Sequence, residues 1–170
     1  MSERRDEPLL GWRIWLVDRN RLRAVVCGIE WPPRARFAAS CEHAPAAFWR
    51  DDRARNDVLH AGSGGGAPEP HAAPDAGCDC GVYAFERRED AELLAAEKAG
   101  GGAVLALGRV SLWGRVVVTE RGYRAELAYP YDLEVLGGDE ELVRELRASY
   151  AVDVAAAPAV ASLHAATGSG

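Results

Sequence analysis

The sequence predicts a single α+β domain, in which a mainly antiparallel twisted sheet or a partly open barrel is flanked by two helices. Short segments rich in aromatic and β-branched residues alternate with turn-forming residues over most of the chain. Helical spacing of apolar residues is clear only in residues 89–99 and 139–150. A length of 170 residues allows one sizeable core but not a second of equal size.

The N-terminal part of the domain is expected to be a hairpin followed by a short strand. Residues 1–10 are polar and charged, so we expect a disordered lead-in before the domain begins. Residues 11–17 and 22–28 are strand-like and are separated by a turn-forming segment. The two prolines at 32 and 33 remove N–H donors and end this ladder. Residues 34–40 then form a third strand that delivers Cys41 to its end.

The central part of the chain is expected to hold the longest strand. A short strand over residues 81–85 precedes the helix at 89–99, which ends at three glycines. Residues 103–118 alternate as a strand does, but the run is too long for an ordinary strand. We therefore expect a bend at Gly108 or Gly114.

The C-terminal part adds two strands and the second helix. Residues 123–129 and 132–136 are strand-like, and Asp139 is a suitable N-cap for the helix that follows. This helix has an apolar stripe of Leu142, Val143, Leu146 and Tyr150. A small strand over residues 151–155 completes the domain, which spans 11–155 with a flexible loop at 61–70. Alanine-rich residues 156–170 are expected to form a disordered tail.

Composition and charge restrict the classes of partner. The net charge of −6 disfavours nucleic acid, because dedicated nucleic-acid binders are usually basic. No apolar run is long enough to span a membrane, and the first residues lack an apolar signal core, so we expect a cytoplasmic protein. Lys98 is the only lysine, and the excess of arginine, alanine and glycine is typical of a GC-rich bacterial genome.

The cysteines and histidines in the first half of the chain indicate a metal site. Cys78 and Cys80 lie one residue apart between glycines, so a tight turn can point both thiols the same way. His71 precedes them, and the strand ending near Cys41 can bring a third thiol. Cys41, His71, Cys78 and Cys80 together form a Cys₃His set, which is typical of a closed structural zinc site. His43 is an alternative to His71 or an added ligand.

Other interpretations of these residues remain open. The cysteines can be inert small residues in a turn, or one can be a redox or catalytic thiol. A catalytic zinc ion would need an open coordination position and a nearby acid or base, and none of Glu42, Asp75 and Asp79 has diagnostic spacing. Cys27 lies in the apolar hairpin and is expected to be a buried small hydrophobic residue.

A second group of residues indicates a possible ligand pocket on the later strands. The functional interpretation is an aromatic platform for a flat ligand such as a base. The alternative, which we favour, is ordinary packing of strand aromatics with a structural Arg–Glu pair. The residues concerned are Trp113, Arg115, Tyr123, Arg124 and Glu126.

Two segments carry a resemblance to a known family. They are His-x-x-Pro-x-x-x-Cys-x-Cys-Gly-Val-Tyr-Ala at 71–84, and Gly-Arg-Val-Ser-Leu-Trp-Gly-Arg-Val-Val at 108–117 followed by Gly-Tyr-Arg-Ala-Glu at 122–126. Over residues 11–154 the chain resembles an uncharacterised family of small, mostly actinobacterial proteins, in which the counterparts of Cys41 and His71 accompany the Cys-x-Cys. The second half loosely resembles a PUA-type barrel. The resemblance implies the metal site and the extent of the domain but supplies no activity.

These observations predict a non-enzymatic, zinc-stabilised binding or regulatory module for a protein or small ligand. A PUA-like reader of nucleic acid or a modified base, using Trp113, Tyr123 and Arg124, is the second hypothesis. A zinc-dependent hydrolase is the third.

Overall fold

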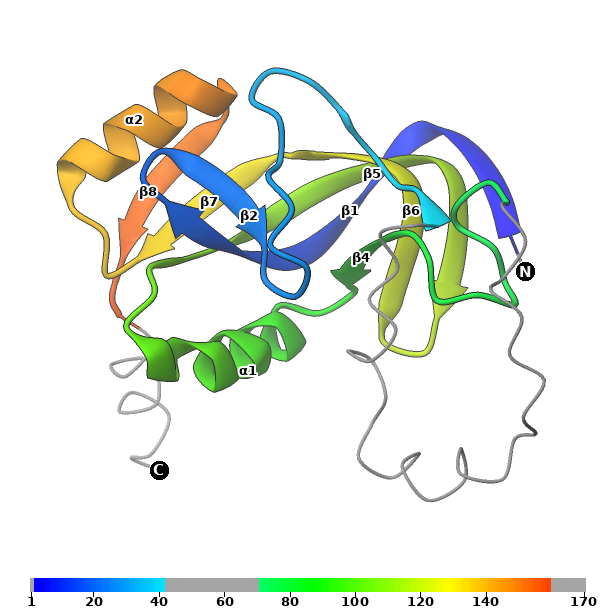
Figure 1. Cartoon of the computed structure of the whole chain (residues 1–170), viewed down its shortest axis with the longest axis horizontal. Coiled ribbons are helices and arrows are strands. Elements are labelled where there is room, and N and C mark those ends of the chain that lie inside the picture. The colour runs from blue at the N-terminus through cyan, green and yellow to red at the C-terminus, as the bar shows by residue number, and fades with distance from the viewer. Residues whose placement is uncertain (1, 42–70, 160–170) are drawn as a thin grey trace.

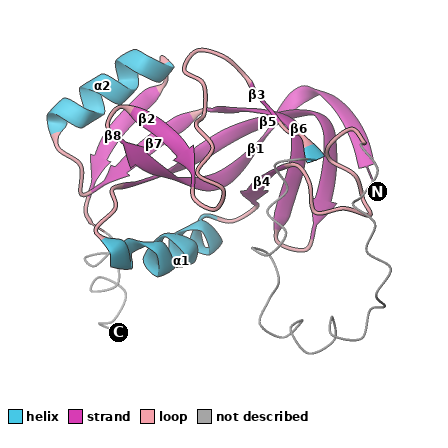
Figure 2. Ribbon diagram, viewed as in Figure 1, coloured by secondary structure: helices cyan, strands magenta, loops and turns pink. Residues whose placement is uncertain are grey.

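The computed structural model describes residues 2–41 and 71–159, and an eight-stranded sheet is its largest feature (Figures 1 and 2). The elements, in chain order, are β1 (Ser2–Asp18), β2 (Arg21–Ala24), β3 (Phe37–Ala38), β4 (Val82–Phe85), α1 (Arg88–Lys98), β5 (Leu105–Thr119), β6 (Gly122–Pro130), β7 (Asp132–Leu136), α2 (Glu140–Tyr150) and β8 (Asp153–Ala157). A 3₁₀ turn, Ala99–Gly101, follows α1.

The sheet is partly closed. Its strands follow the order β2-β1-β4-β6-β5-β7-β8, with β3 paired to β6. Because β1 also pairs with β5, the path β1-β4-β6-β5 returns to its start. The pair β7–β8 is parallel, and the other strand pairs are antiparallel. The predicted α+β class and mainly antiparallel sheet are confirmed at this level.

The long strand β5 contains the expected irregularity at Gly114. Its register with β6 shifts between Trp113 and Val116, and Gly114 has a φ of 77°. A side chain is strained in that conformation, and a Cβ there would lie 2.9 Å from Glu126 Oε2. Gly108 serves another purpose, because a Cβ would lie 2.0 Å from the Asp132 carbonyl oxygen. The predicted bend therefore occurs at Gly114, as a β-bulge.

Residues 2–10 are part of β1, so the expectation of a disordered lead-in was wrong. Ser2 to Arg5 pair with Val117 to Gly114 on β5, and the register shifts between Arg5 and Leu9. The long strand β5 exposes N–H and C=O groups along its edge, and the polar N-terminal segment satisfies them. Side chains that alternate toward solvent at this end of the sheet need not be apolar, so local composition did not reveal the strand.

Two apolar clusters form the core. One lies between the sheet and α2 and contains Trp15, Trp31 and Tyr150; the other lies between the sheet and α1 and contains Leu105 and Leu107. Helix α2 is capped as predicted, since the Asp139 side chain accepts a hydrogen bond from the Leu142 N–H at 2.8 Å. Figure 1 shows α1 and α2 at the same end of the sheet, away from the N-terminus.

The Tyr150 hydroxyl fixes α2 to the start of the chain. It donates to the Trp31 carbonyl and accepts from the Leu22 N–H, each at 2.8 Å. Both residues are almost fully buried, so this hydroxyl satisfies backbone groups that water cannot reach.

At the C-terminal end, Ala156 and Ala157 belong to β8, where a tail was expected. They extend the parallel ladder with Val135 and Leu136, which gives their backbone groups partners. The remainder of the expected tail from residue 160, and the loop at 61–70, lie outside the described residues.

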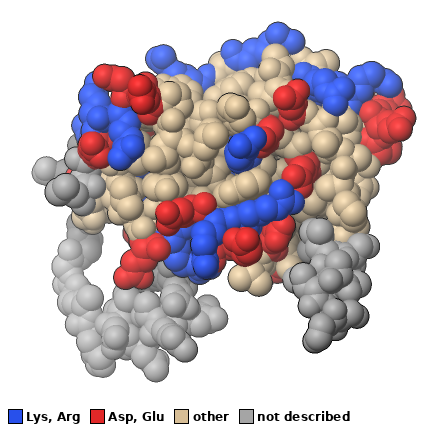
Figure 3. All heavy atoms as spheres, turned by 180° about the vertical axis from the view of Figure 1, so that it is seen from behind, with Lys and Arg blue, Asp and Glu red and all other residues tan. Residues whose placement is uncertain are grey.

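Charged side chains of opposite sign lie side by side on the face shown in Figure 3. Arg88 forms a two-pronged ion pair with Glu134 at 2.6 and 2.8 Å and also contacts Glu92. Arg109 donates from Nε and Nη2 to a single oxygen, Oδ2, of Asp132. Acidic side chains border the basic ones on the face shown in Figure 3. Within the described ranges, no helix has the length and apolar character that crossing a membrane requires.

Candidate metal centre

Four side chains that the sequence predicted as ligands meet at one point. One potential ligand atom from each of Cys41, His71, Cys78 and Cys80 lies within 4.8 Å of all the others. Cys41 Sγ is 3.8 Å from Cys78 Sγ, and His71 Nε2 is 3.3 Å from Cys80 Sγ. All four cysteines of the chain are free thiols. The cluster is close enough to hold a metal ion, and we call it the Cys₃His cluster.

Strand β6 brings the separate parts of the cluster together. On one side, β3 pairs with β6 and the Ala39 N–H donates to the Glu126 carbonyl, which places Cys41 next to this strand. On the other side, β4 pairs with β6 through Val82 and Ala125, directly after the loop that carries Cys78 and Cys80. The two approaches converge because they share one central strand.

We call residues 71–81 the cysteine loop. Hydrogen bonds within the loop hold its conformation. The Asp75 side chain accepts from the Gly77 N–H at 2.8 Å, and the Asp75 carbonyl accepts from the Cys78 N–H at 3.3 Å. The Asp75 N–H points to Cys80 Sγ at 3.4 Å, an interaction that favours a thiolate. Sequence reasoning missed this role of Asp75, although an aspartate two residues before a glycine is typical of an Asx turn.

Arg124 anchors the cysteine loop from β6. Its side chain is only 7% exposed, and Nη1 donates to the carbonyls of Asp75, Cys78 and Cys80. Arg115 adds a bond from Nη1 to the Ala72 carbonyl at 3.1 Å. These arginines thus contact the loop backbone and satisfy carbonyls that a tight turn leaves without ladder partners.

The thiols of the Cys₃His cluster influence one another. Burial and the neighbouring thiol of Cys78 raise the pKa of Cys41 to about 11. Burial acts to raise the pKa of Cys78 too, but hydrogen bonds from Cys80, Cys41 and His71 outweigh it and lower that pKa. Burial and Cys78 raise the pKa of Cys80, against the Asp75 N–H. Cys78 is therefore the thiol of the group that loses its proton most readily, and thiolates at Cys41 and Cys80 would need a nearby cation.

The second predicted group is not gathered into one pocket. Trp113 lies opposite Leu127 and Tyr123 lies opposite Val118, so the two aromatic rings are at different places along the β5–β6 ladder. Trp113 instead lines an open hollow with Tyr129 and Tyr150. Of the remaining members, Arg115 and Arg124 face the cysteine loop, and Glu126 accepts from the Arg115 N–H at 3.0 Å.

Two other expectations have different outcomes. Cys27 is exposed, so its prediction as a buried residue was wrong; it lies in the turn after β2, beyond the packed part of the hairpin. His43, the alternative ligand, lies outside the described residues.

Comparison of the chain with protein-family models, with curated proteins and with solved structures finds no match. The resemblance to an actinobacterial family and to PUA-type barrels therefore remains a prediction from sequence motifs.

Proposed function

We propose that the chain is a non-enzymatic binding module whose Cys₃His cluster holds a structural zinc ion. The mutual approach of four ligand atoms within 4.8 Å, from segments far apart in the sequence, carries this proposal. Three thiolates and an imidazole are a usual tetrahedral zinc shell with no open position. A zinc ion there would join the segment after β3, the cysteine loop and β6.

The surroundings of the Cys₃His cluster favour a structural role. A catalytic zinc ion keeps a water molecule and needs a carboxylate or imidazole as acid or base. The Asp75 carboxylate is already engaged by the Gly77 N–H. Among the described residues, the contacts at the cysteines come from the Asp75 N–H and the Arg124 guanidinium, which stabilise thiolates and carbonyls but do not activate water. These contacts give the hydrolase hypothesis no support.

The nucleic-acid hypothesis also gains no support from the described residues. Arg124 was expected to contact a base, but its donor atom is engaged by backbone carbonyls. Acidic side chains border the basic ones on the face in Figure 3, which disfavours a phosphate-binding surface there. A small ligand or a protein remains the favoured partner of the module.

Metal analysis of the purified protein tests the proposal. We expect one zinc ion per chain in the natural sequence and a large loss of zinc in Cys80→Ser, because its Sγ contacts His71 Nε2. Cys27→Ser is the matched control, since Cys27 is an exposed thiol outside the Cys₃His cluster. Zinc content should be unchanged in that variant.

The pair of variants separates a specific site from general thiol chemistry. Equal zinc loss in both variants would show adventitious binding by free thiols. Absence of zinc from the natural sequence after expression in zinc-supplemented medium would contradict the proposal outright.

A further inference from the structure

A cavity beside the start of β4, next to the end of the cysteine loop, combines apolar walls with a charged side chain. It lies between β1, the turn after β2, β3 and β4, and its volume is about 70 Å³. Its walls are mainly apolar and aromatic, and Val26 and Cys27 at its edge are exposed, so it opens to solvent there. The aromatic and apolar lining residues that matter here are Trp12, Trp31, Phe37, Phe85 and Leu94.

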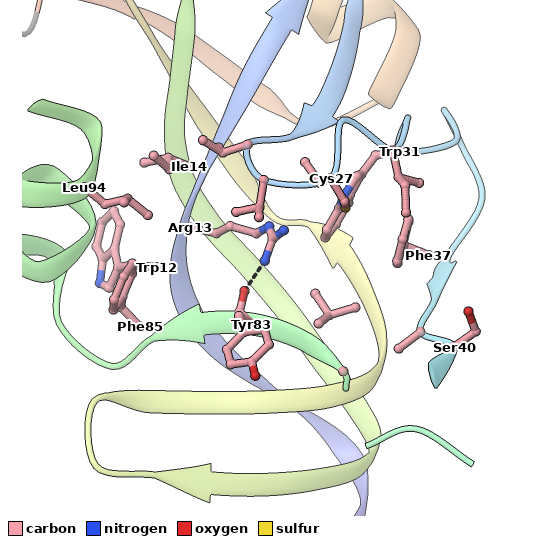
Figure 4. A pocket seen from close by; sticks show the side chains of 17 residues that line it. Trp12, Arg13, Ile14, Cys27, Trp31, Phe37, Ser40, Tyr83, Phe85 and Leu94 are labelled. Carbon is pink, nitrogen blue, oxygen red and sulfur yellow. Dashed lines mark hydrogen bonds between the residues drawn. The ribbon is translucent and has the colours of Figure 1, made fainter. Parts of the chain in front are cut away.

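The guanidinium of Arg13 lies at the centre of this cavity (Figure 4). It donates from Nη1 to the Tyr83 carbonyl and stacks over the Trp31 ring at 5.1 Å. Although part of the side chain reaches solvent, its Nε atom is buried and has no hydrogen-bond partner. Among the described residues Arg13 also makes no ion pair. Such a charge in an apolar pocket is costly unless something completes its hydrogen bonds.

The buried N–H donors without partners indicate which kind of ligand group would complete the cavity. Trp31, which also lines the cavity, has a buried Nε1 without a partner. Guanidinium and indole groups are donors only, so the complementary group is an acceptor, and a planar carboxylate matches the fork of an arginine. We propose that this cavity binds a small apolar carboxylic acid, with its carboxylate on Arg13 and its hydrocarbon part against the aromatic walls.

Size and charge narrow the class of ligand. Burial lowers the pKa of Arg13 to about 10, which leaves the group cationic at neutral pH and able to bind an anion. A single arginine in the lining suits one carboxylate better than a polyphosphate. The cavity is smaller than the roughly 150 Å³ void that encloses benzene, so a branched chain or a single ring would be partly enclosed.

This inference deepens the proposed function, because it names the chemistry of the small ligand for the binding module. It uses none of the four metal ligands. Zinc content and acid binding can therefore be measured on the same sample, and each can fail without the other.

Isothermal titration of the full chain with isovalerate and phenylacetate, each compared with its own amide, tests the inference. We expect the acids to bind with a Kd of about 1 mM or tighter and the neutral amides at least about tenfold more weakly. Inorganic phosphate should bind more weakly than either acid, because it has no apolar part.

Variants locate the binding. Arg13→Met should weaken acid binding at least about tenfold and leave amide binding unchanged, because its unbranched side chain keeps much of the packing. Arg23→Met is the control, since Arg23 is exposed on the neighbouring strand and already paired with Asp18 and Glu30. Circular dichroism and melting curves confirm that each variant is folded, and the acid–amide comparison on the natural sequence needs no variant.

The outcomes of these titrations either support or overturn acid binding in the cavity. Preference for acid over amide that disappears in Arg13→Met supports the inference. Equal binding of acid and amide, unchanged acid binding in Arg13→Met, tighter binding of phosphate, or no binding of either acid would overturn it. Acid binding by a protein that lacks zinc would retain this inference and contradict the proposed function.

Discussion

Arg13 and Arg124 lie on either side of β4 and have opposite surroundings. Arg124 donates from one nitrogen to three carbonyls of the cysteine loop, and its side chain is almost fully buried. Arg13 donates to one carbonyl, that of Tyr83, and otherwise faces the aromatic ring of Trp31. Its buried Nε has no partner. Two arginines near the same short strand are thus satisfied to very different degrees.

The difference separates a structural from a ligand-binding role for a buried charge. A guanidinium whose donors meet backbone carbonyls stabilises the loop that supplies them, and its removal leaves those carbonyls unpaired. A guanidinium with a missing acceptor contributes little to the fold, because burial opposes its charge. We therefore expect Arg124 to matter for folding and metal binding, and Arg13 to matter for a ligand.

The greatest change in stability should come from removing the zinc ion that we propose for the Cys₃His cluster. Removing zinc with a chelator should lower the free energy of unfolding by about 4 kcal/mol, the value for a site held at about 1,000 times its Kd. The reason is that the cysteine loop and the segment at Cys41 would no longer be joined by a shared metal ion. Urea unfolding with and without chelator measures this, with Cys80→Ser as a chelator-insensitive reference. Identical curves for the natural sequence would contradict it.

Arg124→Met should come next. It leaves the carbonyls of Asp75, Cys78 and Cys80 without their donor, at a cost of about 2 kcal/mol in the free energy of unfolding. Zinc affinity should also fall, because the loop geometry loosens. Arg115→Met is a milder comparison, since it removes one exposed bond to Ala72. If the two variants lose equal stability, the prediction that Arg124 stabilises the cysteine loop more than Arg115 does is wrong.

Asp90 is a buried charge with ion-pair partners, and it can be compared with the two arginines. Its contribution to stability should depend on pH. Its buried carboxylate accepts from Arg121 at 2.8 Å, and this bond, together with that from Arg87, holds its pKa below the usual range. A lowered folded-state pKa stabilises the fold above the ordinary carboxyl pKa, and this stabilisation is lost as pH falls through the folded-state value. Asp90→Asn should therefore cost about 1 kcal/mol at pH 7.

The Asp90 measurement is a pair of unfolding curves recorded from neutral to acidic pH. The difference between the natural sequence and Asp90→Asn should shrink as the pH drops. A difference that stays constant over that range would assign the loss to packing and not to the charge.

The smallest expected effect on stability is that of Arg13→Met. Removing an incompletely paired charge from an apolar cavity should change the free energy of unfolding by less than about 1 kcal/mol, or increase it. Melting curves beside those of Arg124→Met test the contrast directly. A loss as large as that of Arg124→Met would mean that Arg13 is a structural residue.

Local patterns in the sequence predicted most elements. The turn after residue 18 and the cap at Asp139 each depend on neighbouring residues, so composition and spacing were sufficient. The bend in the long strand was predicted at Gly108 or Gly114, and only the structure places it at Gly114. The strand at residues 2–10 was missed because its partner is more than a hundred residues away and its polar side chains carry no pattern. Long-range pairing of this kind is set by the edge of β5, which the sequence does not display.

The ligands of the candidate site could be predicted from the sequence, but their distant supporting contacts could not. Ligand chemistry alone selected Cys41, His71, Cys78 and Cys80, and the structure brings them together. The partners of Arg124 could not be predicted, because they are carbonyls of a distant loop. Arg13 could have been noticed in the sequence, because strand alternation places it on the same face of β1 as Trp15, which is fully buried. A charged residue on a core face is a useful indication of an internal binding site.

X-ray absorption at the zinc edge of the purified protein tests the central claim most directly. We expect zinc bound by three sulfur atoms at about 2.3 Å and one nitrogen at about 2.0 to 2.1 Å, with no bound water. A first shell with fewer sulfur atoms, or one that contains oxygen from water, would contradict a closed site formed by Cys41, His71, Cys78 and Cys80.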